Sequence, residues 1–242
     1  MATHLASMTV RRLATCQLTC QPVVMPVEIP LMQALEMAVM DGSIKVPGLP
    51  ATVSGVRGCL LGVNAYLLVS LDEHEHQRRR TAGLTTICDG DALRLLSRLP
   101  HGEAVRVADL TETERRSLRR LPRSAAEVAG GRVTRLALPP VTLRLAIVMD
   151  DAVDRGLDRA SRFAPFAPRL LVLMGPTIDL AFAEVEARFY GIGLAAAGAD
   201  GMVMLADPEP PRRAAGPVTW RVREEAYAAF LAASDPNQRV AR

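Results

Sequence analysis

The sequence predicts a mixed α/β protein in which a helical, hairpin-containing module precedes a small three-layer α/β domain with a mostly parallel sheet. From Val141 to Ala233, apolar strands alternate with amphipathic helices, which is the pattern of such a layered domain. Before it, an arginine-rich helix is followed by two short alternating runs around Gly130-Gly131, which is a hairpin signal. The first 80 residues differ again, because they hold six of the ten methionines and the sole lysine, Lys45.

Residues 1–87 are interpreted as an N-terminal segment without a clear fold signature. Pro30–Met40 fits a helix that has a proline in its first turn and a glycine just beyond its end. Ile44–Gly58 is expected to be loop, because prolines and glycines interrupt it. Cys59–Leu71 is apolar, and periodicity leaves a strand and a buried helix both open. The change in composition near residue 80 also permits a start codon placed upstream of the native one.

The charged segment 72–80 ends this part of the chain and is expected to be a solvated linker. On an extended strand, Asp72, His74 and His76 would share one face, as a metal site requires, so they are the candidate metal ligands. Mixed charge with no apolar position favours the linker instead. Cysteine spacing adds no metal site, since Cys16 and Cys20 form one close pair without a second pair to complete it.

Residues 88–139 are predicted to form the next module. Asp91–Leu99 carries the apolar stripe of an amphipathic helix, with Asp91 as its N-cap. Thr111 begins a second helix that runs to Leu121, and Glu114 three residues later completes a capping box. The hairpin Ala126–Leu138 follows and ends the module.

This order of helix, short linker, arginine-rich helix and two-stranded ribbon across Asp91–Leu138 resembles the winged helix-turn-helix family. The resemblance implies a recognition helix at Thr111–Leu121 and a wing at Ala126–Leu138. It also implies binding of duplex DNA through the recognition helix, although some members of the family bind proteins or peptides. One departure is that only Glu103–Asp109 remains for the usual middle helix, and part of it alternates like a strand.

The arginines of this module are the candidate nucleic-acid site. Acidic residues of the second helix lie only in its first turn, so the rest of its surface and the hairpin are basic. A basic helix beside a basic wing is the electrostatic pattern that DNA binding needs. A solvated helix face in an arginine-rich chain is the alternative. The candidate residues are Arg115, Arg116, Arg119, Arg120, Arg123, Arg132 and Arg135.

Pro139-Pro140 marks the next boundary, and residues 141–235 are expected to be the α/β domain. The predicted strands are Val141–Met149, Arg169–Met174, Tyr190–Ala197 and Met202–Ala206. One helix is expected over 150–162, and the last over Thr219–Ala233. Between them lies a helix capped by Thr177, whose predicted buried stripe is Ile178, Phe182, Val185 and Phe189. Residues 236–242 are expected to be a disordered tail.

Candidate catalytic groups are Asp150 and Asp151, at the carboxyl end of a predicted strand, with Glu184 as a third carboxylate. Together they could hold Mg²⁺ in a metal-dependent nuclease. Surface pairing is the alternative, because Asp151–Arg155, Asp158–Arg162 and Glu184–Arg188 have the spacing of helical ion pairs. Nucleotide-binding and hydrolase motifs are absent, so no cofactor is predicted and a non-enzymatic role is favoured.

The function predicted from the sequence is that of a DNA-binding transcriptional regulator whose α/β domain senses a ligand or dimerises. An adaptor that binds a partner protein or peptide through the winged helix is the alternative, and a metal-dependent nuclease is the third. No apolar run reaches the roughly 20 residues that span a bilayer, so no membrane partner and a cytoplasmic location are expected. Assembly into a homo-oligomer is compatible with the sequence.

Overall fold

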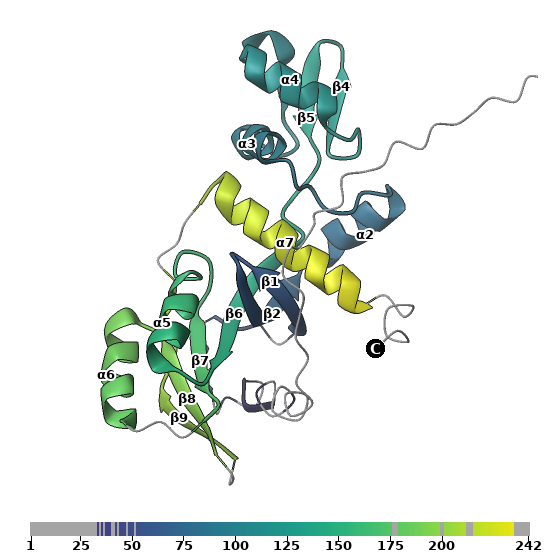
Figure 1. The fold of residues 1–242 in the computed structure, drawn as a ribbon. Coiled ribbons are helices and arrows are strands. Elements are labelled where there is room, and N and C mark those ends of the chain that lie inside the picture. The colour runs from purple at the N-terminus through teal and green to yellow at the C-terminus, as the bar shows by residue number, and fades with distance from the viewer. Residues whose placement is uncertain are drawn as a thin grey trace, which may run out of the picture.

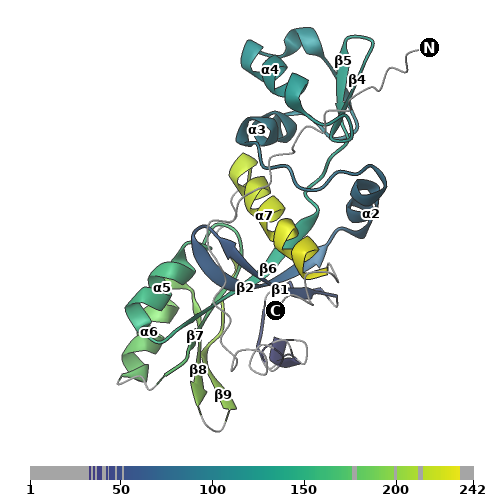
Figure 2. The ribbon, with the colours of Figure 1, turned by 45° about the vertical axis from the view of Figure 1, so that its right-hand side comes forward.

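The computed structural model describes residues 52–175, 179–198, 201–211 and 215–234, together with separate positions between 33 and 50. Within this part of the chain, the strands form two sheets, one of six strands in the order β1-β2-β6-β7-β8-β9 and one of three in the order β3-β5-β4. Both views place α4 and the strands β4 and β5 at one end of the molecule and α6, β8 and β9 at the other (Figures 1 and 2). The fold is therefore mixed α/β, with its two sheets well separated.

The large sheet begins with a hairpin of β1 (Ser54–Leu60) and β2 (Val63–Leu71). The turn is made by Leu61 and Gly62, whose φ angles are 55° and 75°. Two positive φ angles are characteristic of a type I′ turn, which matches the twist of the flanking strands. The apolar run Cys59–Leu71 is thus the end of β1, the turn and β2, and not a buried helix. The strand β1 begins inside the segment expected to be loop.

The large sheet is mixed, which corrects the expectation of a mostly parallel one. The strands β6 (Val141–Asp150), β7 (Arg169–Leu173) and β8 (Gly193–Gly198) are parallel to one another. However, β2 pairs with β6 and β9 (Gly201–Ala206) pairs with β8 in antiparallel fashion. Strands β1 and β2 of the N-terminal segment therefore belong to a sheet that was predicted to contain only residues after 140. The sequence could not predict this, because pairing between distant segments leaves no local signal.

Both faces of this sheet are covered. Buried residues of α5 (Val153–Ser161), α6 (Leu180–Tyr190) and α7 (Pro217–Ser234) share one core cluster with one face. On the other face, the described helical positions Leu35 and Val39 pack against β2, β6 and β7. The predicted helix over 30–40 agrees at the positions that are described, and its remaining residues lie outside them, as do Cys16, Cys20, Thr177 and the predicted tail 236–242.

Helix α6 buries a different face from the one predicted. Its N-cap is Asp179, and the residues buried against the sheet are Ala183 and Ala187. By contrast, the predicted core positions Phe182, Val185 and Phe189 are 58, 64 and 82% exposed. Small side chains let the helix lie close to the sheet, and this proximity sets the buried face. Ile178 lies outside the described residues.

The segment expected to be a charged linker is the helix α2 (Glu73–Thr81), which Asp72 caps through a hydrogen bond from the Glu75 amide. Glu75 and Arg79 are buried on it, at 1 and 0% exposure. The interpretation as a solvated linker was wrong. A buried ion pair between Glu75 and Arg79, which continues to Glu224 of another helix, replaces the apolar stripe that usually marks a buried helix face.

The small sheet belongs to a unit that begins with α3 (Gly90–Arg98), whose N-cap is Asp89 and not the predicted Asp91. The chain continues through β3 (Ala104–Arg106), the 3₁₀ turn η1 (Val107–Asp109) and α4 (Glu112–Arg120). The predicted capping box of Thr111 and Glu114 is present at the start of α4. The predicted hairpin is also present, as β4 (Ala126–Ala129) and β5 (Arg132–Arg135), and positive φ angles at both glycines make its turn.

Helix α7 connects the two cores (Figure 1). Trp220, near its start, belongs to the core cluster of the α3–β5 unit, whereas Val222, Ala226 and Tyr227 belong to the core of the large sheet. The helix contacts α3 on one side and β1 and β6 on the other. No described helix has the length and apolar character needed to cross a membrane.

Candidate nucleic-acid interface

The exposed face of α4 carries three arginines that share a single carboxylate. The nitrogens Arg115 Nε, Arg116 Nε and Arg119 Nη2 lie 3.3, 3.4 and 3.5 Å from oxygens of Glu112. The hydrogen bond from Arg115 is the main reason that the pKa of Glu112 lies below its ordinary value. One negative charge cannot neutralise three positive ones, so this face keeps a positive excess.

Two further candidates extend the positive charge beyond this cluster. Arg120 makes only a long ion pair of 3.8 Å with Asp91, and its side chain remains exposed. Arg123 follows the end of α4, is exposed, and forms no ion pair with any described residue. In the sequence of residues 90–135, ten arginines face six acids, an excess of four, whereas the whole chain has a net charge of +3. The positive charge of the protein is therefore concentrated in this unit.

The two hairpin arginines have different surroundings. Arg132 is exposed at the tip and donates a long hydrogen bond of 3.3 Å to the carbonyl of Ala104. Arg135 instead turns inward, donates a 2.8 Å hydrogen bond to the carbonyl of Leu96, and lies over the ring of Trp220 at 5.4 Å. Six of the seven candidate arginines therefore lie on the outer surface of the unit, and Arg135 lies apart from them.

A hollow of about 670 Å³ separates α4 from the hairpin. Arg119 and Arg123 lie at it, beside apolar side chains, of which Val128 is 56% exposed. The apolar lining residues are Leu118, Leu121, Ala126, Val128 and Leu136. This combination can receive either a phosphate backbone at the arginines or an apolar side chain in the hollow.

The candidate catalytic carboxylates are engaged by arginines. The carboxylate of Asp150 is buried and lies 2.6 Å from Arg155 Nη2 and 2.7 Å from Arg159 Nη1. Burial raises the pKa of Asp150, but hydrogen bonds from Arg155 and the Ala152 amide outweigh it and hold the pKa below its ordinary value. Asp151 pairs with Arg155 as well.

Glu184 is 2.8 Å from Arg188 on α6, as the helical spacing predicts, and the predicted pair of Asp158 and Arg162 is also present. Each of the three candidate carboxylates therefore already has a cationic partner. Among the described residues, no group of three acidic, histidine or cysteine side chains is arranged to hold a metal ion. The structure does not bring Asp150, Asp151 and Glu184 into one such group.

The candidate metal ligands of the charged segment occupy a helix and not an extended strand. Asp72 caps α2, and His74 is exposed. His76 is partly buried, and its Nδ1 is 2.9 Å from the hydroxyl of Tyr227. The shared face that a strand would provide is lost, because residues two apart on a helix point in nearly opposite directions.

Sequence reasoning missed the surroundings of Arg135, which include Ser97, Trp220 and Arg223. An arginine on α7 with no acid at the spacing of a helical pair was an available signal, since Thr219 and Tyr227 stand four residues before and four residues after Arg223. Comparison with protein-family models, with curated proteins and with solved structures gives no match for this chain.

Proposed function

We propose that the protein binds duplex DNA through α4 and the β4–β5 hairpin, as a winged helix does. The observation that carries the proposal is the order β3-β5-β4 of the small sheet, which joins the hairpin to the strand that precedes α4. With α3 ahead and η1 in place of the middle helix, this is the succession expected of a winged helix with its middle helix reduced to one turn. In this proposal α4 is the recognition helix.

The charge distribution supports the same proposal. Helix α4, which carries the exposed Arg116 and Arg119, lies at the end of the molecule away from α6, β8 and β9 (Figure 2). Guanidinium groups bind phosphates and the edges of guanine through paired hydrogen bonds. Arg116, Arg119 and Arg120 would then reach the major groove and its phosphates, and Arg132 would contact the backbone through the hairpin. Arg135 is not part of this set, since it is held beneath the hairpin.

The regulatory role is proposed for the domain of the large sheet, as the part that senses a ligand or dimerises, in a cytoplasmic protein. Support comes from α7, which enters both cores and so joins that domain directly to the DNA-binding unit. A change on either side would be transmitted through one continuous helix.

The test is a titration of labelled duplex DNA at several salt concentrations. Six phosphate contacts predict a slope of about −5 for log K against log[salt]. Arg119→Glu should weaken binding by at least about 10-fold, since it reverses a charge at the phosphate backbone. Arg162→Glu, which reverses an exposed charge at the C-cap of α5, far from α4, is the matched control and should leave affinity nearly unchanged. Affinity that is absent, or equally reduced by both variants, contradicts the proposal.

A second candidate is supported by the hollow between α4 and the hairpin, which would receive a peptide with apolar and acidic side chains. Its lining is apolar apart from two arginines and Glu127, so an excess of one positive charge remains for such a ligand. Val128→Asp places a charge at this lining and distinguishes the two functions. It should abolish capture of a peptide while lowering DNA affinity far less than Arg119→Glu does.

A further inference from the structure

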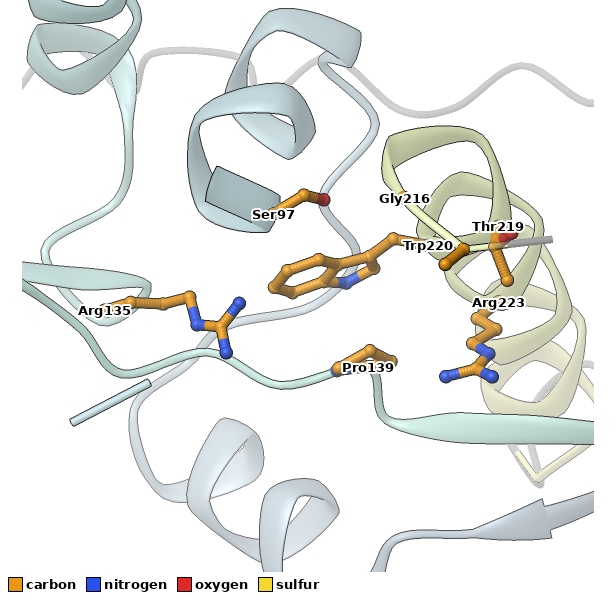
Figure 3. A pocket seen from close by; sticks show the side chains of 8 residues that line it. Ser97, Arg135, Pro139, Gly216, Thr219, Trp220 and Arg223 are labelled. Atoms are coloured by element: carbon orange, nitrogen blue, oxygen red, sulfur yellow. The ribbon is translucent and has the colours of Figure 1, made fainter. Parts of the chain in front are cut away.

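A separate cavity of about 270 Å³ lies where the α3–β5 unit meets α7. Ser97 of α3, Arg135 of β5 and Pro139 of the following segment line one part of it, and Trp220 and Arg223 of α7 line another (Figure 3). The guanidinium groups of Arg135 and Arg223 extend toward the region of Pro139 from opposite sides in this view. Residues from the α3–β5 unit and from α7 therefore contribute to one concave site.

The cavity is positively charged without compensation. No aspartate or glutamate is among its described lining residues. Arg223 is followed by two acids, but Glu224 is turned into the buried ion pairs of α2, and Glu225 pairs with Arg221 at 3.0 Å. Arg223 itself forms no ion pair with any residue that the structure describes. Burial, and then the nearby charge of Arg144, lower the pKa of Arg223, which reflects surroundings that lack an anion.

Two polar atoms of the lining residues are buried without a hydrogen-bond partner, namely Arg135 Nε and Ser97 Oγ. The guanidinium of Arg135 donates a hydrogen bond to the carbonyl of Leu96 and lies over the Trp220 ring. Buried donors in folded proteins are nearly always satisfied, and an exception calls for an explanation. Both residues line the cavity, so a ligand with acceptor oxygens could supply the partners that these atoms lack.

We propose that this cavity binds a small-molecule oxyanion, a compound with a phosphate or carboxylate group, and that Arg135 and Arg223 contact it from opposite sides. The ring of Trp220 and Pro139 provide apolar walls for the rest of the molecule. The ligand is small, because the volume lies just below the roughly 300–1,000 Å³ of typical ligand pockets. The site is independent of the DNA-binding surface, since it uses none of the outer arginines of α4.

The test is calorimetric titration of the whole protein with inorganic phosphate and, separately, with succinate at matched ionic strength. Binding of phosphate alone assigns the ligand to phosphate compounds, and binding of succinate alone assigns it to carboxylates. Arg223→Ala should lower the affinity for whichever anion binds by about 10- to 100-fold, because it removes a charge-assisted contact. Arg221→Ala, an equal change of charge on the exposed side of the same helix, should change affinity by less than about twofold.

Thermal unfolding in the absence of ligand shows whether the variants are folded. Arg223→Ala should leave the melting temperature unchanged or raise it, since it removes an unpaired charge beside Arg144. Ser97→Ala, which removes only the hydroxyl, is a second variant and should also lower the affinity for the anion. The proposal is overturned if neither anion binds, or if Arg221→Ala weakens binding as much as Arg223→Ala does.

Discussion

Arg79 of α2 and Glu224 of α7 are joined by two hydrogen bonds of 2.8 Å, from Nη1 to Oε2 and from Nη2 to Oε1. Both side chains are fully buried. Arg79 Nε also donates to Glu75, and its guanidinium reaches the carbonyls of Thr85 and Leu138. Glu224 accepts further bonds from the Ile87 amide and the Trp220 indole. Every donor of the arginine is thus satisfied at the junction of both cores.

Arg79→Met is expected to lower the free energy of unfolding by about 3–5 kcal/mol, because it leaves Glu224 buried without its cation and leaves Glu75 paired with Arg78 alone. Chemical denaturation measures the loss. Arg221→Met, which removes an exposed partner of Glu225 on the same helix as Glu224, is the control and should cost no more than about 1 kcal/mol. Equal losses in the two variants would show that the buried pairs contribute nothing beyond a surface pair.

The stability of the protein is expected to fall in acid through Glu75. Burial raises the pKa of this carboxyl, but hydrogen bonds from Arg78 and Arg79 outweigh it and hold the pKa below its ordinary value. A pKa depressed by folding gives stability that is present above the unfolded pKa, about 4.3, and is lost as the pH falls through the folded pKa. Denaturation midpoints between neutral pH and pH 3 measure this loss. Glu75→Gln should be less stable at neutral pH and less sensitive to acid, so a parallel decline of both proteins would contradict the assignment.

Gly156→Ala in α5 is expected to destabilise the protein by about 1–3 kcal/mol, although alanine is the better helix former. A methyl group there would lie 2.5 Å from Leu171 Cδ1 and 3.2 Å from Asp150 Cβ. The buried side chain of Leu171 on β7 would have to change its rotamer, or the helix would have to move away from the sheet. Gly90→Ala in α3 is the control, since a methyl group meets nothing within 4 Å at that position, and it should be neutral or stabilising. Thermal unfolding of both variants makes the comparison.

The orientation of α6 is tested by two substitutions on opposite faces. Phe189→Ser should change the free energy of unfolding by less than about 0.5 kcal/mol, because the ring is exposed. Ala183→Leu should cost about 1–3 kcal/mol, because the methyl group is fully buried against the sheet. If Phe189→Ser proves the more destabilising of the two, the result would contradict this orientation of α6 and favour the buried face predicted from the sequence.

These results separate what local sequence encodes from what it does not. The capping box of Thr111 and Glu114 and the Gly130-Gly131 turn were predictable, because each depends on residues a few positions apart. The buried face of α6 was not, since two alanines, and not the large apolar residues, contact the sheet. The helix α2 was missed for a related reason, as its buried residues are ionic and their partner is Glu224, far along the chain.

The candidate interface divides in the same way. The exposure of Arg116, Arg119 and Arg120 follows from the helical stripe that buries the other side of α4, so the sequence predicts it. The inward course of Arg135 depends on Trp220, which only the folded chain brings beside it. The sequence does not show which side of the hairpin this arginine occupies, because the aromatic ring that it contacts is distant in the chain.

The position of α7 has a consequence for the order in which the protein is made. Residues 217–234 are synthesised after every other described element, yet they provide Trp220 to one core and Val222 and Ala226 to the other. A nascent chain that has reached residue 211 therefore holds two incomplete cores, and Arg79 has not met Glu224. Both halves of the molecule reach their final stability together, when this helix emerges from the ribosome.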